Sequence, residues 1–259
     1  MKRLQVILIC LVLFIFSSVA AYSATRKIEF ASYTPDPVIT AQILENPQII
    51  EEKIRVAMNR ILSNPATLTI NIEYGTNEET SIGKLKRVYV ETSGGNAEGL
   101  VLDRANVEFL DVQLNTTELF ENKDIEPVDL NDIYMDVLIT EKALNDLLLK
   151  KIKKINVKNP KILLKKDRMH LSGSTKYGIL RAEFSADGKL DVTKDGKEIW
   201  FHASNLKINH MAMPRSFVGM IVKRMNPVLK LDDFPFKLNL KSIEIEPGSI
   251  HFTSGSDKN

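Results

Sequence analysis

Residues 105–114 read Ala-Asn-Val-Glu-Phe-Leu-Asp-Val-Gln-Leu, and the predicted fold depends on this stretch more than on any other. Apolar and polar residues alternate in it, as they do in a strand that buries one face of an antiparallel sheet. Two apolar sets of opposite phase follow one another: Ala105, Val107 and Phe109, then Leu110, Val112 and Leu114. A slip of one residue would turn the second set to the other face unless a β-bulge absorbs it. We therefore expect a long, bulged and twisted strand.

The same change of phase occurs in two later stretches. Ile199, Phe201 and Ala203 precede Leu206 and Ile208, and Phe236, Leu238 and Leu240 precede Ile243 and Ile245. Because bulged strands bend and twist more than regular ones, the predicted fold class is α+β. We expect a long, strongly curved antiparallel β-sheet wrapped around two or three α-helices.

Further alternating stretches supply the other strands of this sheet. The expected strands cover residues 68–74, 83–91, 99–115, 132–139, 160–166, 168–177, 179–192, 198–208, 236–246 and 249–253. Asp187-Gly188 and Asp195-Gly196 are hairpin-type turn pairs, and Pro247-Gly248 joins the last two strands.

Three helices are expected between the strands. The first runs from Pro47 to Leu62, with Asn46 as N-cap and Pro47 at the first helical position. The second is capped by Thr140 and ends at Lys151, and the third runs from Pro214 to Asn226. Thr34-Pro35-Asp36-Pro37, before the first helix, is a loop or turn signal.

The N-terminal residues resemble an export signal. Lys2 and Arg3 precede an apolar run over residues 4–20, and small residues follow it. We expect a cleaved signal peptide over residues 1–23, an entry segment over 24–45 and a single lipid-binding-like domain over 46–259. The alternative is an uncleaved anchor, because the run is close to the ~17-residue minimum for crossing a bilayer.

Charge and cysteine content exclude two classes of protein. The chain has 35 basic and 33 acidic residues, and loss of Lys2 and Arg3 would leave a neutral mature protein. A nucleic-acid-binding domain normally keeps a basic excess. The only cysteine, Cys10, lies in the predicted signal, so the mature chain would have neither a disulfide nor a cysteine-ligated metal.

No recognised catalytic or phosphate-binding motif is present. The chain lacks Gly-x-Ser-x-Gly, Gly-x-x-x-x-Gly-Lys and Gly-x-Gly-x-x-Gly. Ser81-Ile82-Gly83-Lys84 has Ser-x-x-Lys spacing, but without companion motifs we interpret it as chance. The four histidines lack metal-ligand spacing and are expected on solvated strand faces: His170, His202, His210 and His251.

Two surfaces carry alternative interpretations. Lysines and one arginine cluster between residues 150 and 168, either as a patch for anionic headgroups or as a solvated strand edge. Methionines and other apolar residues crowd residues 211–225, either as a lining for acyl chains or as ordinary core.

Four stretches resemble a known family: residues 82–90, 100–114, 138–148 and, above all, 234–250. The last reads Phe-Pro-Phe-Lys-Leu-Asn-Leu-Lys-Ser-Ile-Glu-Ile-Glu-Pro-Gly-Ser-Ile. The chain is similar over roughly residues 46–253 to the LmeA-like phospholipid-binding family, which is related to the tubular lipid-binding (TULIP, BPI-like) superfamily. The resemblance implies a curved sheet around helices, an apolar groove for acyl chains and no catalytic residues.

The sequence therefore predicts a bacterial envelope protein, exported to the periplasm, that binds or transfers lipid without catalysis or a cofactor. Its partners would be lipid and a peripheral membrane surface, and not nucleic acid. Predicted groove residues are Ile50, Ile54, Met58, Ile61, Met211, Met213, Phe217, Met220, Ile221, Met225, Phe234 and Phe236. Predicted headgroup or membrane-surface residues are Lys165, Lys166 and Arg168. The alternatives are a structural or assembly protein on the same scaffold and an enzyme acting on envelope lipids or glycans.

Overall fold

The computed structural model describes residues 33–97, 100–151, 157–177, 180–212, 214, 226–227, 229–230 and 240–254. The described chain is α+β, with open antiparallel sheets and a few helices. The helical elements are α2 (Pro37–Glu45), α3 (Ile49–Ile61), α4 (Asn77–Ser81), the π-helical turn η1 (Glu118–Asn122) and α5 (Glu141–Lys151). Predicted signal residues 1–23 and the predicted third helix lie outside the described residues, apart from positions 214 and 226.

Two sheets contain most of the strands. The first has the order β1-β2-β5-β6-β14-β13, and the second has the order β11-β10-β9-β8-β7 with β12 also pairing to β10. The strands of the first sheet are β1 (Thr67–Tyr74), β2 (Lys84–Ser93), β5 (Arg104–Leu114), β6 (Pro127–Thr140), β13 (Leu240–Glu246) and β14 (Ser249–Ser254). Those of the second are β7 (Val157–Lys165), β8 (Arg168–Tyr177), β9 (Leu180–Val192), β10 (Glu198–Ile208), β11 (Met211–Ala212) and β12 (Leu229–Lys230). β3 (Gly95–Ala97) and β4 (Leu100–Leu102) form a separate pair.

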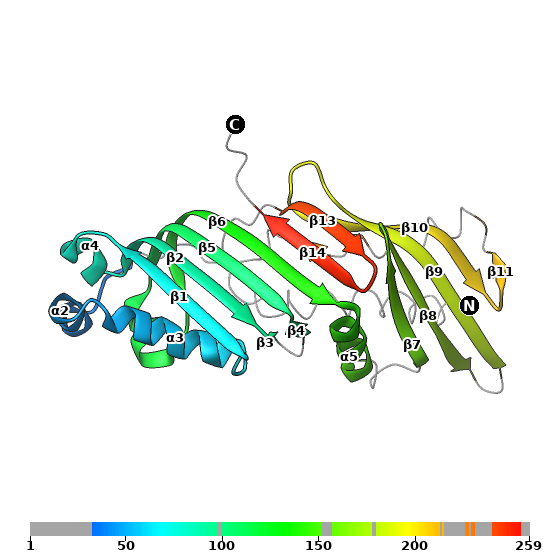
Figure 1. Ribbon diagram of the computed structural model, residues 1–259, viewed down its shortest axis with the longest axis horizontal. Helices are drawn as coiled ribbons and strands as arrows, with labels where there is room; N and C mark the ends of the chain where they lie inside the picture. The colour runs from blue at the N-terminus through cyan, green and yellow to red at the C-terminus, as the bar shows by residue number, and fades with distance from the viewer. Residues whose placement is uncertain are drawn as a thin grey trace.

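The division into two sheets differs from the predicted single long sheet. Figure 1 shows the sheets side by side along the long axis, with α2, α3 and α4 at one end and α5 near the middle. After β6 the chain enters α5 and does not continue into a neighbouring strand, so β7 begins a new sheet. β13 contacts β7, β8 and β9 without pairing with them.

Two hydrophobic clusters stabilise this arrangement. One joins α2 and α3 to β1, β2 and β5, and the other joins α5 to the second sheet and to β6, β13 and β14. Residues from both sheets, such as Ile139 and Phe201, lie in the second cluster. Apolar burial therefore connects the two sheets where backbone pairing does not.

The predicted phase changes of β5 and β10 are present, whereas the third was predicted from a set that includes Phe236 and Leu238, which lie outside the described residues. Asp111 has a φ of 46°, which interrupts the regular alternation of side chains between the two faces of β5, between Phe109 and Val112. In β10 the register shifts between Ala203 and Asn205, which leaves Ser204 as an extra residue opposite β9. In β13 the register shifts between Leu240 and Ser242. The curvature predicted from these irregularities stays a prediction.

Two local predictions were wrong. Asn46 is the C-cap of α2, and the N-cap of α3 is Gln48, which makes no side-chain capping bond. Asp187-Gly188 is not a turn, because β9 runs through it. Gly188 is needed there for space, since a Cβ would lie 2.3 Å from the ring of Phe201. Asp195-Gly196 does form a turn, with Gly196 at a φ of 70°.

The helix α2 is an element that the sequence analysis missed. Asp36 accepts hydrogen bonds from the backbone nitrogens of Val38 (2.8 Å) and Ile39 (3.0 Å), and Pro37 occupies the first turn. The loop signal that was identified at residues 34–37 is therefore the start of a helix.

Candidate functional site

An apolar pocket of about 230 Å³ lies between α3 and the first sheet. Its lining combines one side of α3, the inner face of β2 and β5, and the segment that enters β6. The lining residues are Ile54, Met58, Ile61, Val88, Val90, Phe109, Val112, Leu114, Ile125 and Pro127. None of these side chains can donate or accept a proton, so the pocket offers contact with hydrocarbon and no acid, base or nucleophile.

The phase change in β5 determines which side chains face the pocket. Phe109 and Val112 have opposite parity, so a regular strand would direct them to opposite faces. Because Asp111 has a left-handed φ of 46°, both line the pocket together with Leu114. The irregularity that first appeared as a sequence pattern thus builds the floor of this site.

Helix α3 forms the roof because of its amphipathic sequence. Ile50, Ile54 and Ala57 are buried against the sheet. Glu51 and Glu52 lie in the first turn and Arg60 in the last, an arrangement that matches the helix dipole. Short valine side chains at 88, 90 and 112 lie opposite the helix. We infer that these short side chains leave part of the space beneath α3 unfilled.

The predicted groove residues divide into four groups. Ile54, Met58 and Ile61 line the pocket, whereas Ile50 is buried in the same cluster without lining it. Met211 lies on β11 with 65% of its surface exposed. Met213, Phe217, Met220, Ile221, Met225, Phe234 and Phe236 lie outside the described residues. The role of these residues in lipid binding stays a prediction.

The sequence analysis missed the floor of the pocket. Val88, Val90 and Val112 were assigned to strands, but nothing marked them as pocket residues. The available signal was the phase change in β5, which shows that residues of both parities reach one face. The contribution of Ile125 and Pro127 was not visible in the sequence, because it depends on where the chain returns after η1.

The predicted headgroup residues Lys165, Lys166 and Arg168 lie together at the turn between β7 and β8, and all three are exposed. The backbone nitrogen of Asp167, which has a φ of 59°, donates a 2.8 Å hydrogen bond to the carbonyl of Ile245. Within the described chain none of the three basic side chains forms a salt bridge. Figure 1 shows α3 on one side of α5 and the strands β7 and β8 on the other side. The turn between these strands therefore does not border the apolar pocket.

A second pocket, of about 300 Å³, lies on the second sheet and is lined mostly by residues with polar side chains. Its lining residues are Asn159, Ser172, Gly173, Ser174, Glu183, Phe184, Ser185, Lys207 and His210. His210 Nε2 lies 3.6 Å from Glu183 Oε2, but the His210 side chain is 89% exposed. Such an open pair lacks the enclosure that catalytic acid–base pairs usually have.

Histidines, nucleophiles and membrane spans give no further site in the described residues. Each histidine has a carboxylate oxygen within 4 Å: Asp187 for His170, Asp191 for His202, Glu183 for His210 and Asp136 for His251. No group of three potential metal ligands occurs among the described residues. Ser81 is buried and donates to the Glu78 carbonyl at 2.7 Å. Within the described ranges, no helix has the length and hydropathy of a transmembrane helix.

Comparison with known proteins gives one match. The model of a family described as LmeA-like phospholipid-binding matches residues 79–254. This range includes the sheet side of the apolar pocket and the β7–β8 turn, and it begins after α3. No curated protein and no solved structure gives a significant match.

Proposed function

We propose that this chain, which belongs to the LmeA-like phospholipid-binding family, holds an acyl chain of its lipid in the apolar pocket beneath α3. The observation that carries the proposal is the pocket itself, a wholly apolar space of about 230 Å³ inside a phospholipid-binding fold. A protein whose interior only supported its own fold would be expected to fill such a space with side chains.

The size of the pocket suits part of one acyl chain. A cavity of about 150 Å³ holds benzene, which has six carbons. By the same proportion the pocket holds about nine carbons. Each buried methylene contributes roughly 0.8 kcal/mol. Burial of such a segment therefore gives a favourable term of up to about 7 kcal/mol, from which the cost of association must be subtracted.

A substitution that fills the pocket tests this proposal. Val88 is 4% exposed and lies on the pocket floor, so Val88→Phe should place a ring where the acyl chain would lie. We expect the affinity for a fluorescent fatty acid to fall at least tenfold. The matched control is Val56→Phe, since Val56 lies on α3 with 38% of its surface exposed. Unchanged binding by Val88→Phe, with the fold intact, would refute the proposal.

We also propose that the protein is exported to the bacterial envelope and meets anionic membranes through Lys165, Lys166 and Arg168. The basic start and apolar run of residues 1–20 support export. The absence of acidic partners for the three exposed cations in the described chain supports the membrane contact. Each such residue near an anionic surface contributes about 1 kcal/mol.

Vesicle co-flotation tests this second part. Replacing Lys165 and Lys166 by Glu should abolish binding to vesicles that contain anionic lipid and leave fatty-acid binding unchanged. Lys86→Glu, at an exposed position on β2, is the control for a change of charge elsewhere. If Lys86→Glu reduces vesicle binding as much as the replacement of Lys165 and Lys166, the membrane contact is not specific to the β7–β8 turn. The non-catalytic role and lipid transfer between membranes stay proposals.

The alternative function is a structural or assembly role on the same scaffold. It requires an interior without room for an alkyl chain, so the pocket beneath α3 favours lipid binding over it. Mass spectrometry of the purified protein under native conditions separates the two, because only a lipid-binding protein should carry co-purified lipid.

A further inference from the structure

Ile61 is the one exposed residue among those that line the apolar pocket, so the pocket meets solvent beside it. Ile61 lines the pocket and is 37% exposed. Ile125, which is half-buried, also lines the pocket. The residues that precede these two in the chain are charged: Arg60 on α3, and Lys123 and Asp124 on the segment between η1 and β6. An amphiphile whose tail enters here would have its polar end beside these groups.

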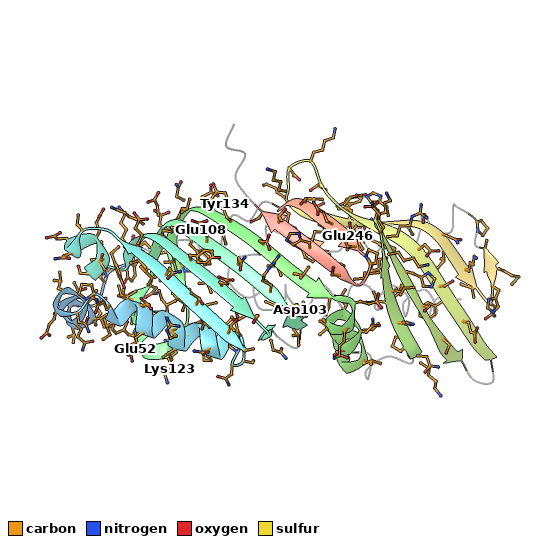
Figure 2. The ribbon with its side chains drawn as sticks, viewed as in Figure 1. Glu52, Asp103, Glu108, Lys123, Tyr134 and Glu246 are labelled. Carbon is orange, nitrogen blue, oxygen red and sulfur yellow. The ribbon has the colours of Figure 1, made fainter. Side chains whose placement is uncertain are left out.

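Arg60 connects the two segments that carry Ile61 and Ile125. Its Nε donates a 3.1 Å hydrogen bond to the carbonyl of Lys123, and its Nη2 lies 3.3 Å from Asp124 Oδ1. Each of the two segments joined in this way supplies lining residues. Figure 2 shows Lys123 on the chain segment that lies next to α3. Arg60 therefore connects the roof of the pocket to the side of its entrance.

The contact between Arg60 and Asp124 can be exchanged at little cost. The two side chains are 51% and 37% exposed, and ion pairs this exposed to solvent contribute little to stability. A guanidinium group offers a planar set of donors that fits the oxygens of a phosphate. Glu52 and Glu121 balance Lys53 and Lys123 along this part of the chain. Selection of a phosphate would thus depend on the geometry of Arg60 more than on a long-range positive field.

We propose that Arg60 binds the phosphate of the lipid whose acyl chain occupies the pocket beneath α3, exchanging Asp124 for that phosphate. This inference rests on the proposed function. It assigns the headgroup of the bound lipid to the end of α3, whereas the Lys165–Arg168 turn contacts the membrane surface. The ligand class is an amphiphile with one acyl chain in the pocket and a phosphate at its entrance.

The test compares two amphiphiles of equal chain length, a lysophosphatidic acid and the corresponding monoacylglycerol, which lacks the phosphate. Binding is measured by displacement of a fluorescent fatty acid. Arg60→Gln should weaken binding of the lysophosphatidic acid roughly tenfold and leave the monoacylglycerol unaffected. Asp124→Asn, which removes the competing carboxylate, should strengthen binding of the lysophosphatidic acid.

The chain offers a closely matched control. Arg104 lies 3.4 Å from Asp136, with exposures of 51% and 37%, which are the values of the Arg60–Asp124 pair. Arg104 is on β5, outside the pocket lining. Arg104→Gln should therefore change neither affinity.

Three outcomes would overturn the inference. If Arg60→Gln weakens both amphiphiles equally, Arg60 has only a structural role. If it weakens neither while the wild-type protein binds both, the phosphate lies elsewhere and only this inference fails. If inorganic phosphate at equal concentration displaces the lysophosphatidic acid, the site binds free phosphate. Failure of the wild-type protein to bind either amphiphile would instead refute the proposed function together with this inference.

Discussion

Helices α3 and α5 both cover a sheet, but the two are attached in different ways. Helix α5 binds the backbone of β7 directly: Asn145 donates to the Ile162 carbonyl and accepts from the Ile162 nitrogen, both at 2.8 Å. Glu141 accepts from the nitrogen of Leu164 at 2.6 Å. Helix α3 has fewer such bonds, and half-exposed arginines make the contacts with its neighbours.

This difference explains where the pocket lies. A helix whose side chains bond to a strand edge has its distance from that strand fixed by those bonds. A helix that rests on apolar side chains can leave space beneath it where these are short, as at Val88 and Val90. A helix fixed by hydrogen bonds thus closes the space beneath it, whereas a helix attached more loosely can leave a pocket there.

The largest expected effect comes from breaking the fixed attachment. Asn145→Leu would leave the nitrogen and carbonyl of the buried Ile162 without partners. Since an unsatisfied buried polar group costs about 1–3 kcal/mol, we expect the free energy of unfolding to fall by about 3 kcal/mol in urea denaturation. Asn131→Leu, which loses only an exposed bond to Asp111, is the control. Equal losses would show that α5 is not held through this edge.

The next largest difference is expected when a larger side chain is introduced beneath each helix. Leu147 of α5 is fully buried, so Leu147→Phe should cost about 1–3 kcal/mol by overpacking. Val88→Phe enlarges a residue that borders empty space, and its cost should stay below about 1 kcal/mol. Thermal unfolding of both variants measures the difference. A larger loss for Val88→Phe would mean that the space beneath α3 cannot hold a ring.

A smaller effect is expected where α3 reaches β1. Arg55 donates to the Leu68 carbonyl at 3.1 Å and pairs with Glu51 at 2.9 Å, with side chains 40% and 37% exposed. We expect Arg55→Ala to lower the free energy of unfolding by less than about 1 kcal/mol. Glu51→Gln removes the ion pair but keeps the bond from Arg55 to the Leu68 carbonyl, so comparing the two variants gives the contribution of each interaction. A loss as large as that of Asn145→Leu would remove the contrast between the helices.

The smallest effect concerns Tyr74, which packs beside α3. Its hydroxyl is buried without a hydrogen-bond partner in the described structure. Tyr74→Phe should therefore change the stability at pH 7 by no more than about 0.5 kcal/mol, since it removes an unsatisfied group.

The same tyrosine gives a prediction for pH dependence. Burial, and secondarily the charge of Glu51, raise the pKa of Tyr74 above 10.0. Above pH 10 the unfolded chain therefore loses this proton before the folded chain does, so stability falls as the pH rises. Urea denaturation at pH 8 and pH 10.5 should show a smaller fall for Tyr74→Phe than for the wild-type protein. An identical fall would contradict the raised pKa.

Much of the fold could be predicted because alternation and turn residues act locally. The strands around Leu68–Tyr74 and residues 198–208 are close to their predicted bounds, and the Thr140 hydroxyl does cap α5, accepting from Ala143 N at 3.3 Å. The local errors had a common cause. Asn46 and Gly188 belong to residue types that serve more than one purpose. The preceding helix α2 determined the role of Asn46, and Phe201 of the neighbouring strand determined that of Gly188.

The site was predictable only in part, for a physical reason. The apolar stripe of α3 is periodic, so Ile54, Met58 and Ile61 could be identified from the sequence. The floor and entrance combine residues distant in sequence, such as Val88, Phe109 and Ile125. The charged contact between Arg60 and Asp124 also joins distant segments, and no local pattern predicts it.

The extra residue in β10 determines where this strand can lose a residue. Removing Ser204 would restore an unbroken ladder with β9 and would keep Leu206 and Ile208 opposite Ala186 and Phe184. Removing Trp200 instead would place Ile199 and Phe201, which are both buried, on opposite faces of the strand. A deletion at Ser204 is therefore far less damaging than one in the regular part of the strand, where the number of residues, as much as their identity, is under structural constraint.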